Sequence, residues 1–264
     1  MKRINMDWKY DYVVILPNSS KRCLCKSLES INNQILQPKK ILITHDNPEL
    51  KICCEVLCKA TSKAEIHRNL GLFNVSKSRN FAISKSNSSF IAFLDDDDTW
   101  EPNKMSIQLT FMNQMNIQIT GTNALKMSSR DPYFVSNGTR FFHFSDFLKQ
   151  NEFVTSSVVI ARNLLDPLGG FRGLSESGED YVLWLRIHFI GIRSARIESF
   201  LVNYQDKGES LSRQFSESGS TQKLRLLKFF LREVLTLPLM RSTMTNLLRL
   251  VFEIMRETRT NAKS

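Results

Sequence analysis

Three features are missing from the sequence, and each absence excludes a class of protein. No window approaches the roughly 18 apolar residues that a membrane-spanning helix needs. Residues 1–9 are polar, and the first apolar run, Tyr12–Pro17, is too short and too far along the chain for a secretory signal. None of the 10 glycines is followed by lysine and then serine or threonine, which argues against a P-loop. We therefore expect a cytoplasmic protein that does not span the membrane.

Cysteine and histidine are scarce, with 5 and 4 residues among 264. The cysteines fall in the stretches CLC and CCEVLC, which lack the paired spacing of zinc ligands, and no histidine lies at a matching offset. In a reducing compartment we expect the cysteines to remain free thiols.

The net charge is +10, which favours an anionic partner such as nucleic acid, lipid or a phosphorylated substrate. We expect no nucleic-acid partner, because the sequence contains neither a metal finger nor the aromatic pair of an RNA-recognition motif. Much of the charge is at the end of the chain. Residues 221–264 contain 9 lysines and arginines against 3 glutamates, a balance of +6.

Short apolar runs alternate with segments of helical periodicity in the first hundred residues. This alternation is typical of βαβ units and a mostly parallel sheet, so we predict an α/β fold. Open sheets of this kind bind ligands at the carboxyl ends of their strands, and polar residues follow three of the runs. The expected strands are residues 12–17, 39–46, 64–69 and 89–95, and the expected helices are residues 25–36, 49–60 and 75–86.

The second half of the chain changes in character. We expect a strand at residues 155–161 and an amphipathic helix at residues 179–190. We divide the chain into a catalytic domain, residues 1–205, and a basic amphipathic helical extension, residues 206–264. Apolar residues of the extension fall on one face of each of two helices: Leu224, Leu227, Leu231, Val234 and Leu235, then Met244, Leu247, Leu248, Val251 and Met255.

Four consecutive aspartates, Asp95–Asp98, end the strand predicted at residues 89–95. Clustered carboxylates favour a hard divalent cation, Mg²⁺ or Mn²⁺, which often also binds substrate phosphates. Two other interpretations are a solvated acidic turn and the Walker B element of a P-loop protein, and the missing P-loop argues against the second.

The stretch FIAFLDDDDTWEPNKMSIQL resembles the metal-binding segment of family 2 glycosyltransferases, which use nucleotide sugars and have the GT-A fold. Three other stretches resemble family elements in the right order: VVILPNSS the first strand and nucleotide loop, SKSRNFAISKS the Arg-Asn helix, and GGFRGLSESGEDYVLWLRIHFIG the Gly-Gly-Phe loop and catalytic helix. The resemblance covers about residues 10–205. It implies a Rossmann-like mixed sheet flanked by helices and an inverting transfer of a hexose from a UDP-sugar, with UDP-Glc or UDP-Gal favoured.

The same resemblance assigns roles on the donor side of the site. Asp97 is an implied ligand of Mn²⁺ or Mg²⁺, with Asp98 or else Asp95 as the second ligand, and Asp96 falls at a variable position where we expect it to face solvent. His45 stands where the family has an aspartate, so either Asp46 contacts the base or the base is held differently; we still expect uridine. The implied nucleotide-sugar contacts are Pro17, Asn18, Ser19, His45, Asp46, Arg79, Asp95 and Asp96.

On the acceptor side, the resemblance makes Asp180 the general base, with Glu179 beside it. From the residues alone, a carboxylate at a helix start is equally an ordinary cap. Trp184 shares a helical face with Asp180 and either walls the acceptor site or belongs to the core. Ser156 and Arg186 are further acceptor candidates.

Bacterial members of the family extend glycans on polyprenyl diphosphate, which implies such an acceptor, in O-antigen or capsule assembly, and a β-linked product. The basic extension then either lies on the anionic inner face of the plasma membrane or packs on the catalytic domain. One alternative function is a sugar-phosphate nucleotidyltransferase, although LPNSSKR lacks the expected glycines. Another is a degenerate sugar-nucleotide-binding subunit, against which the intact acidic motifs argue.

Overall fold

The computed structural model describes most of the chain, and the statements below refer to the part that it describes. The helix predicted at residues 49–60 lies outside that part, as do the predicted site residues Ser19 and Asp46. The described residues are 10–18, 24–45, 62–68, 74–135, 137–172, 178–206, 224, 226–231 and 241–261.

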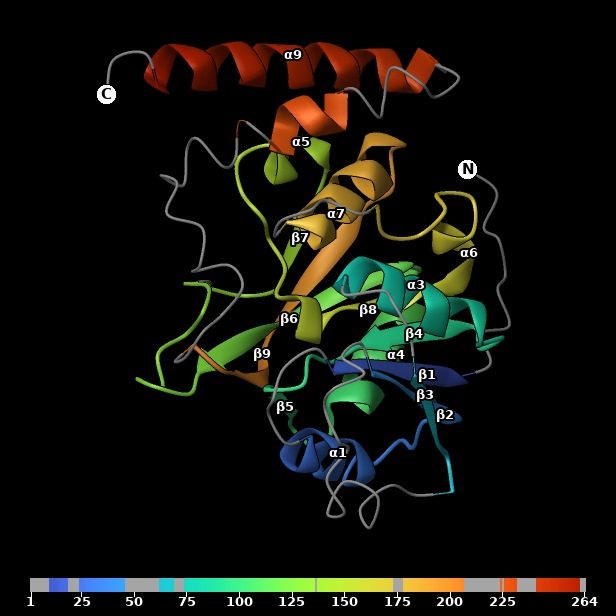
Figure 1. The fold of residues 1–264 in the computed structure, drawn as a ribbon. Coiled ribbons are helices and arrows are strands. Elements are labelled where there is room, and N and C mark those ends of the chain that lie inside the picture. Colours follow the sequence, from blue (N-terminus) through green and yellow to red (C-terminus); the bar gives the residue numbers. More distant parts are fainter. Residues whose placement is uncertain are drawn as a thin grey trace.

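The first part of the chain forms the predicted parallel strands. Strand β1 lies between β2 and β4, with β3 beyond β2, and all four run parallel (Figure 1). Helix α3 starts at an asparagine cap, because Asn74 Oδ1 accepts hydrogen bonds from the backbone nitrogens of Ser76 and Lys77. Four predicted strands and two predicted helices are thereby confirmed, with slightly different ends. The elements are β1 (Tyr12–Asn18), α1 (Cys25–Asn32), β2 (Lys40–His45), β3 (Ala64–Arg68), α3 (Val75–Ser84) and β4 (Phe90–Phe93).

The later strands extend the same sheet beyond β4 and make it mixed. Strand β8 is antiparallel to both β4 and β6, whereas β6 and β9 run parallel, and the strand order within the described residues is β3-β2-β1-β4-β8-β6-β9-β5, with β7 also on β9. The strands are β5 (Thr99–Trp100), β6 (Ile119–Lys126), β7 (Arg140–Phe142), β8 (Val159–Ala161) and β9 (Ser194–Tyr204). The helices among them are α4 (Lys104–Met115), α5 (Phe144–Phe147), α6 (Arg162–Leu165) and α7 (Glu179–Phe189).

The prediction of one strand over residues 155–161 is wrong for its first four residues. Thr155–Ser157 form a 3₁₀ turn, and only Val159–Ala161 join the sheet. The turn closes through hydrogen bonds from Ser157 N to Val154 O and from Val158 N to Thr155 O. The turn directs the hydroxyl of Thr155 to the Asp180 carboxylate and the hydroxyl of Ser156 to the Asp98 carboxylate.

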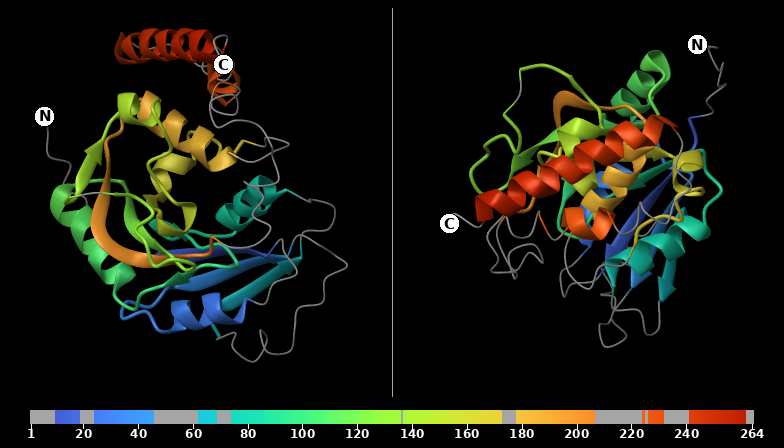
Figure 2. Two further views of the ribbon diagram at one scale, coloured as in Figure 1. Left: turned by 90° about the vertical axis from the view of Figure 1, so that its left-hand side faces the viewer. Right: turned by 90° about the horizontal axis from the view of Figure 1, so that it is seen from above.

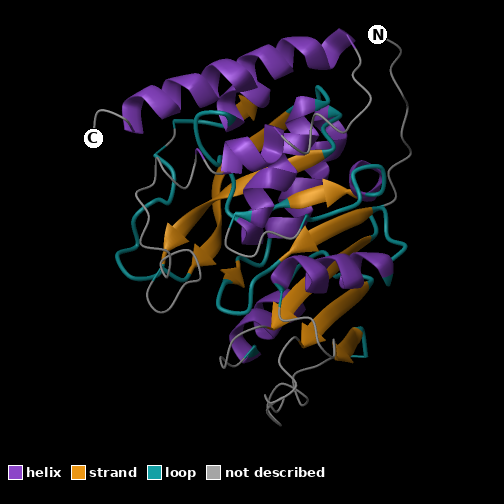
Figure 3. Ribbon diagram, turned by 45° about the horizontal axis from the view of Figure 1, so that its top comes forward, coloured by secondary structure: helices purple, strands orange, loops and turns teal. Residues whose placement is uncertain are grey.

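The sheet separates two apolar cores, because successive side chains of a strand point to opposite faces. Val13 and Ile15 of β1 pack on the side of α3, α5 and α7, whereas Val14 and Leu16 pack on the side of α1 and α4. Figures 2 and 3 show the resulting three layers, with helices on both faces of a twisted sheet.

Helix α7 is buried on nearly every side, so the prediction that it is amphipathic is wrong. All residues from Tyr181 to Phe189 are buried. The reason is its position, since α7 packs on the sheet core on one side and on α5 and α9 (Arg241–Asn261) on others. Even its polar residues are enclosed: His188 hydrogen-bonds with Trp184 O and with Ser194 Oγ.

The C-terminal extension packs against this same region. Residues 226–231 are helical, and Leu226, Leu227 and Phe230 are buried in the core around α7. Helix α9 crosses above α5 and α7 (Figure 1), where Leu250 is buried and Asn246 Nδ2 donates to Phe189 O at 2.8 Å. No helix in the described part of the chain is long and apolar enough to pass through a bilayer.

The face that α9 buries is different from the apolar face predicted from its sequence. Leu247 is partly buried, but Leu248, Val251 and Met255 of that predicted face are exposed, together with Phe252. The extension therefore uses one side of α9 for packing and leaves an apolar strip on another.

Candidate active site

The carboxyl ends of β1 and β2 meet the loop of aspartates in a buried polar cluster. Asn18 pairs with His45 across the two strands, and His45 Nδ1 lies 2.9 Å from Asn18 Oδ1 in a hydrogen bond. Asn18 Nδ2 donates to Asp96 Oδ2 at 3.5 Å. Pro17, the preceding residue of β1, is also buried. The structure thus brings together Pro17, Asn18, His45 and Asp96, all predicted on the nucleotide side.

The loop of residues 95–98, called here the aspartate loop, is held from α1. The Ser27 hydroxyl lies 2.9 Å from Asp98 O and 3.1 Å from Asp96 O, so it hydrogen-bonds the loop backbone. The expectation that Asp96 faces solvent is wrong, since its side chain is only 8% exposed and contacts Asn18. The sequence missed this because it does not show how tightly α1 closes over the loop.

Asp98 is the most enclosed of the four aspartates. Its Oδ2 accepts a hydrogen bond from the Ser156 hydroxyl, and its Oδ1 accepts one from Gln205 N at 2.8 Å. Burial raises the pKa of Asp98 well above its usual range, and the charges of Asp95 and Asp97 raise it further. The hydrogen bonds from Ser156 and Gln205 offset this rise only in part, so Asp98 holds its negative charge less easily than an exposed aspartate does.

Arg79 of α3 bridges the aspartate loop and the start of α7. Its Nη2 donates to Asp95 Oδ1 at 2.7 Å and its Nη1 to Glu179 Oε1 at 2.8 Å. Burial lowers the pKa of Arg79, but the charges of Asp95 and Glu179 outweigh it and raise that pKa overall. Its Nε has no hydrogen-bond partner among the described residues. Arg79, predicted to contact the nucleotide, is thus an enclosed cation shared by two carboxylates.

Glu179 and Asp180 form the first turn of α7, which begins at Gly178 with a φ of 107°. A left-handed φ of this kind is easily adopted only by glycine. Burial raises the pKa of Glu179, as does the Asp180 charge, while Arg79 opposes both. Helix starts stabilise negative charge, which suits two acids here.

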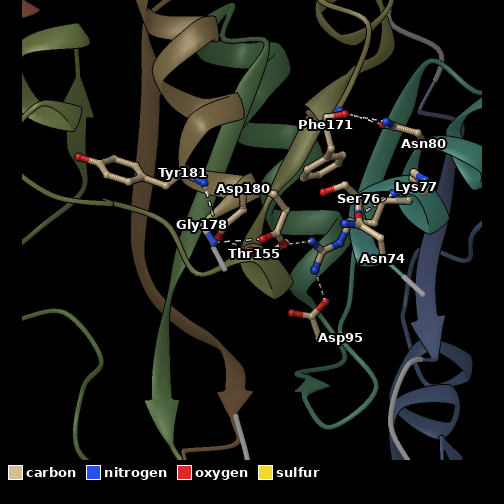
Figure 4. A network of polar contacts seen from close by, with 12 residues as sticks. Asn74, Ser76, Lys77, Asn80, Asp95, Thr155, Phe171, Gly178, Asp180 and Tyr181 are labelled. Carbon is tan, nitrogen blue, oxygen red and sulfur yellow. Dashed lines mark hydrogen bonds and ion pairs between the residues drawn. The ribbon is translucent and has the colours of Figure 1, made fainter. Parts of the chain in front are cut away.

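The carboxylate of Asp180 is oriented by two donors. Thr155 Oγ1 donates to Asp180 Oδ2 at 2.7 Å, and the Tyr181 backbone nitrogen donates to Oδ1 at 2.7 Å (Figure 4). The next residue of the 3₁₀ turn, Ser156, binds Asp98 and accepts a hydrogen bond from Asp95 N at 3.1 Å. Adjacent residues thus connect Asp180 to the aspartate loop.

Trp184 and Arg186 do not lie where an acceptor could contact them, which corrects their prediction. Trp184 is 0% exposed and packs among Phe93, Phe153 and Phe171. Arg186 is buried and donates to the backbone oxygens of Leu168 and Gly170. Both belong to the core because α7 is enclosed on all sides. Ser156, the third acceptor candidate, is buried beneath the aspartate loop.

The Gly-Gly-Phe loop is fixed to α3 beside Arg79. Asn80 binds both backbone groups of Phe171, with Nδ2 donating to its oxygen at 2.7 Å and Oδ1 accepting from its nitrogen at 2.8 Å. Gly170 has a φ of 66°, and a Cβ there would lie 2.3 Å from Asn80 Oδ1. Glycine is therefore required at Gly170, and the loop seats the Phe171 ring against the Arg79 guanidinium.

The donor set suits a divalent cation that is shared with a ligand. Within the described residues, no three Asp, Glu, His or Cys side chains are arranged to hold a metal ion by themselves. The carboxylate oxygens of Asp97, which is half-buried, and of Asp98 are the hard donors that Mg²⁺ and Mn²⁺ prefer. These two carboxylates therefore fit part of the ligand set of such a cation.

Several contacts in the site were not predicted from sequence. Thr155 holds Asp180, Ser27 holds the aspartate loop, and Gln205 binds Asp98 from the end of β9. Serine and threonine are common in loops, so their type gave no signal. The position of Gln205 directly after a strand was the one available hint, because strand ends line the site.

Comparison with known proteins places this arrangement in a family. The chain matches the family described as glycosyl transferase family 2 over residues 13–165, more than half of its length. The UDP-Glc:alpha-D-GlcNAc-diphosphoundecaprenol beta-1,3-glucosyltransferase WfgD of Escherichia coli is 27% identical over 180 residues, which cover 67% of this chain and 70% of that relative. The O-antigen biosynthesis glycosyltransferase WbnJ of Escherichia coli is 23% identical over 222 residues, covering 80% and 85% of the two chains.

A solved structure extends the likeness beyond the matched residues. The crystal structure of S. aureus TarS 1-349 in complex with UDP-GlcNAc aligns with a TM-score of 0.73 at 15% sequence identity, covering 94% of this chain and 72% of that chain. This likeness shows the fold, which is GT-A as predicted. With the family match over the aspartate loop and the strands that carry it, the chain belongs to glycosyl transferase family 2.

Proposed function

We propose that the protein is an inverting glycosyltransferase that moves a hexose from a UDP-sugar, UDP-Glc or UDP-Gal, to a hydroxyl of a polyprenyl-diphosphate-linked saccharide. One observation carries the proposal: Thr155 and Ser156 connect a single oriented carboxylate, Asp180, to the aspartate loop. A base and a donor-binding loop at a fixed separation are what a one-step displacement at the anomeric carbon requires. The name of WfgD supports a UDP-Glc donor and a lipid-diphosphate acceptor, and the name of WbnJ supports a role in O-antigen assembly.

On the donor side, the residues at the ends of β1 and β2 would hold the nucleoside. Asn18 and His45 form a rigid buried pair, and Pro17 precedes them. Ser19 and Asp46 follow directly in sequence and complete the proposed nucleotide contacts. Asp95 and Asp96 would contact the ribose and sugar, since Arg79 and Asn18 fix their carboxylates.

Asp97 and Asp98 would hold a Mn²⁺ or Mg²⁺ ion. When bound, the ion would supply Lewis-acid stabilisation of the charge on a departing diphosphate. Arg79 would position the aspartate loop for ion binding. One nitrogen of its guanidinium pairs with Asp95 of the loop, and another pairs with Glu179 of α7.

On the acceptor side, Asp180 would accept the proton of the attacking hydroxyl. Its two hydrogen bonds fix the carboxylate plane, and the ion pair of Glu179 with Arg79 leaves Asp180 as the base. One displacement inverts the anomeric centre, so an α-linked UDP-sugar gives a β-linked product.

We further propose that the inner face of the plasma membrane is a partner, through the exposed strip of α9. Leu248 is 65% and Phe252 66% exposed, and Arg249 and Arg256 lie on the same exposed side of the helix. An apolar strip flanked by arginines suits the headgroup region of anionic lipid. Vesicles of phosphatidylglycerol should retain the wild type and release the Leu248→Ser/Phe252→Ser variant; equal retention of both would contradict this proposal.

The activity is tested by a screen of UDP-sugars with a saccharide diphosphate acceptor, read as UDP release. We expect one donor to support acceptor-dependent release, with EDTA abolishing it and Mn²⁺ or Mg²⁺ restoring it. Release that is indifferent to EDTA and to added ions would refute the metal role. Failure of every UDP-sugar, while a different nucleotide sugar is turned over, would refute the uridine assignment.

A further inference from the structure

An aromatic cluster lies beside the aspartate loop on the side away from β1 and β2. The rings of Tyr133 and Tyr204 are packed edge to face with their centroids 5.0 Å apart, and the centroids of Tyr133 and Phe134 are 4.8 Å apart. Tyr133 is 38% exposed, and Tyr204 is half-buried. The three rings therefore present a partly open apolar surface instead of being sealed in a core.

The backbone register places Tyr204 next to Asp98. Thr99 pairs with Asn203 in the antiparallel β5–β9 ladder, and the residue after Tyr204, Gln205, donates its backbone N–H to Asp98 Oδ1. The opposite side of the aspartate loop is occupied by the Asn18–His45 pair. The aromatic surface and the proposed nucleoside site thus flank the loop from different sides.

The charges of two site carboxylates act on the Tyr133 hydroxyl. Burial raises the pKa of the Tyr133 hydroxyl, and the negative charges of Asp180 and Asp98 raise it further. Burial likewise raises the pKa of Tyr204, followed by the charges of Tyr133 and Asp98. The Tyr133 hydroxyl therefore feels the charge of Asp98, which we assign to the donor side, and of Asp180, which we assign to the acceptor side.

The cluster is held rigidly by groups behind it. Asn123 binds the backbone of Phe134 at both its nitrogen and its oxygen, and Met127 N donates to Tyr204 O at 2.8 Å. The Arg196 guanidinium lies 3.8 Å from the Phe134 ring centroid and is fixed by an ion pair with Glu152. In contrast, neither the Tyr133 nor the Tyr204 hydroxyl forms a hydrogen bond with any described residue. Fixed rings with unused hydroxyls are suited to a ligand that is apolar on one face and polar at its edge.

We propose that Tyr133 and Tyr204 form the platform on which a pyranose ring of the saccharide acceptor packs. This rests on the proposed function. The C–H face of a sugar ring would cover the aromatic surface, and its hydroxyls would meet the two phenol groups. In this arrangement the reacting hydroxyl of the bound sugar would have to reach Asp180. The platform takes the role that the sequence suggested for Trp184, which is buried in the core.

The test replaces both tyrosines by leucine, singly and together, and by phenylalanine as the conservative change. The acceptor probe is GlcNAc α-diphosphate carrying a short alkyl chain, chosen from the name of the relative WfgD. Binding of the probe and of UDP is measured separately by calorimetry, and turnover by UDP release. Phe141→Leu is the matched control, because Phe141 is 40% exposed but pairs with Ala195 near the other end of β9.

We expect each leucine variant to weaken probe binding about tenfold, as the loss of an aromatic contact does, while the phenylalanine variants stay within about threefold. UDP binding and the thermal midpoint should not change, and Phe141→Leu should match the wild type. An unchanged probe affinity in the double leucine variant would overturn the platform, as would a wild type that does not bind the probe. A wild type that binds probe and UDP without transfer would refute the proposed function, while the binding comparison still decides the platform.

Discussion

The two halves of the sheet build their parts of the site in different ways. In the N-terminal half, strands β3, β2, β1 and β4 run parallel, and site residues are simply the last residues of neighbouring strands. In the C-terminal half, strands β8, β6, β9 and β5 are mixed in direction, and Asp180 comes from a helix start. Its partner Thr155 is 25 residues away, and the Arg79–Glu179 pair joins residues 100 apart. Topology alone places the residues of the proposed donor side, whereas long-range side-chain contacts place the proposed base, Asp180.

The largest effect that this comparison predicts is at the base. Asp180→Asn keeps the shape and the hydrogen bond from Thr155 but removes the proton acceptor, so kcat should fall about a thousandfold. UDP binding, which we propose depends on the N-terminal half, should be unchanged when measured by calorimetry. Asp166→Asn, which alters an exposed carboxylate of a surface ion pair, serves as the control. A variant with normal turnover would show that Asp180 is not the base.

The next effect concerns the bridge between the halves. Arg79→Met should destabilise the protein by about 3–5 kcal/mol, because Asp95 and Glu179 would be left without their buried partner. Lys40→Met breaks a pair with Glu65 that lies within one half and is partly open to solvent, so it should cost less than about 1 kcal/mol. Urea unfolding measures both. Equal losses in the two variants would mean that Arg79 is not a special link between the halves.

A third prediction concerns acid stability of the C-terminal half. Burial lowers the pKa of His188 from 6.5 to about 4, so its neutral form is the one that the fold accepts. Because the pKa of His188 is lower in the folded state, the unfolded protein binds the proton first as the pH falls. The stability that depends on neutral His188 is therefore complete above pH 6.5 and is lost as the pH falls towards 4. The loss should reach about 3 kcal/mol at the acid end.

The measurement is the free energy of unfolding at several pH values between 4 and 7 for wild type and His188→Gln. The variant should lose less stability across this window than the wild type does. His143→Gln, which changes an exposed histidine whose charge also lowers the His188 pKa, should keep a slope closer to that of the wild type. If His188→Gln also kept it, the acid loss would originate elsewhere.

The sequence predicted the N-terminal half well because each strand there is a single apolar run ending in polar residues. It predicted the roles of the C-terminal half less well. The sequence pattern predicts a solvent-exposed face on helix α7, yet Trp184 and Arg186 lie in the core. Helices α5 and α9 cover the face that the pattern leaves open to solvent. Burial on all sides depends on which elements pack together, and that information is not local.

The smallest effect tests whether the 3₁₀ turn truly links the halves. Thr155→Val keeps the side-chain volume but removes the hydroxyl that donates to Asp180, so the carboxylate should lose orientation and kcat should fall about tenfold. Thr155→Ser should restore most of the activity, since the hydroxyl returns. Ser157→Ala removes a hydroxyl of the same turn that binds only Val154 O among the described residues, and it should leave kcat near the wild-type value. If the serine variant stayed as slow as the valine one, the turn would act through packing. The base would then be positioned by α7 alone, and the two halves would be coupled only through Arg79.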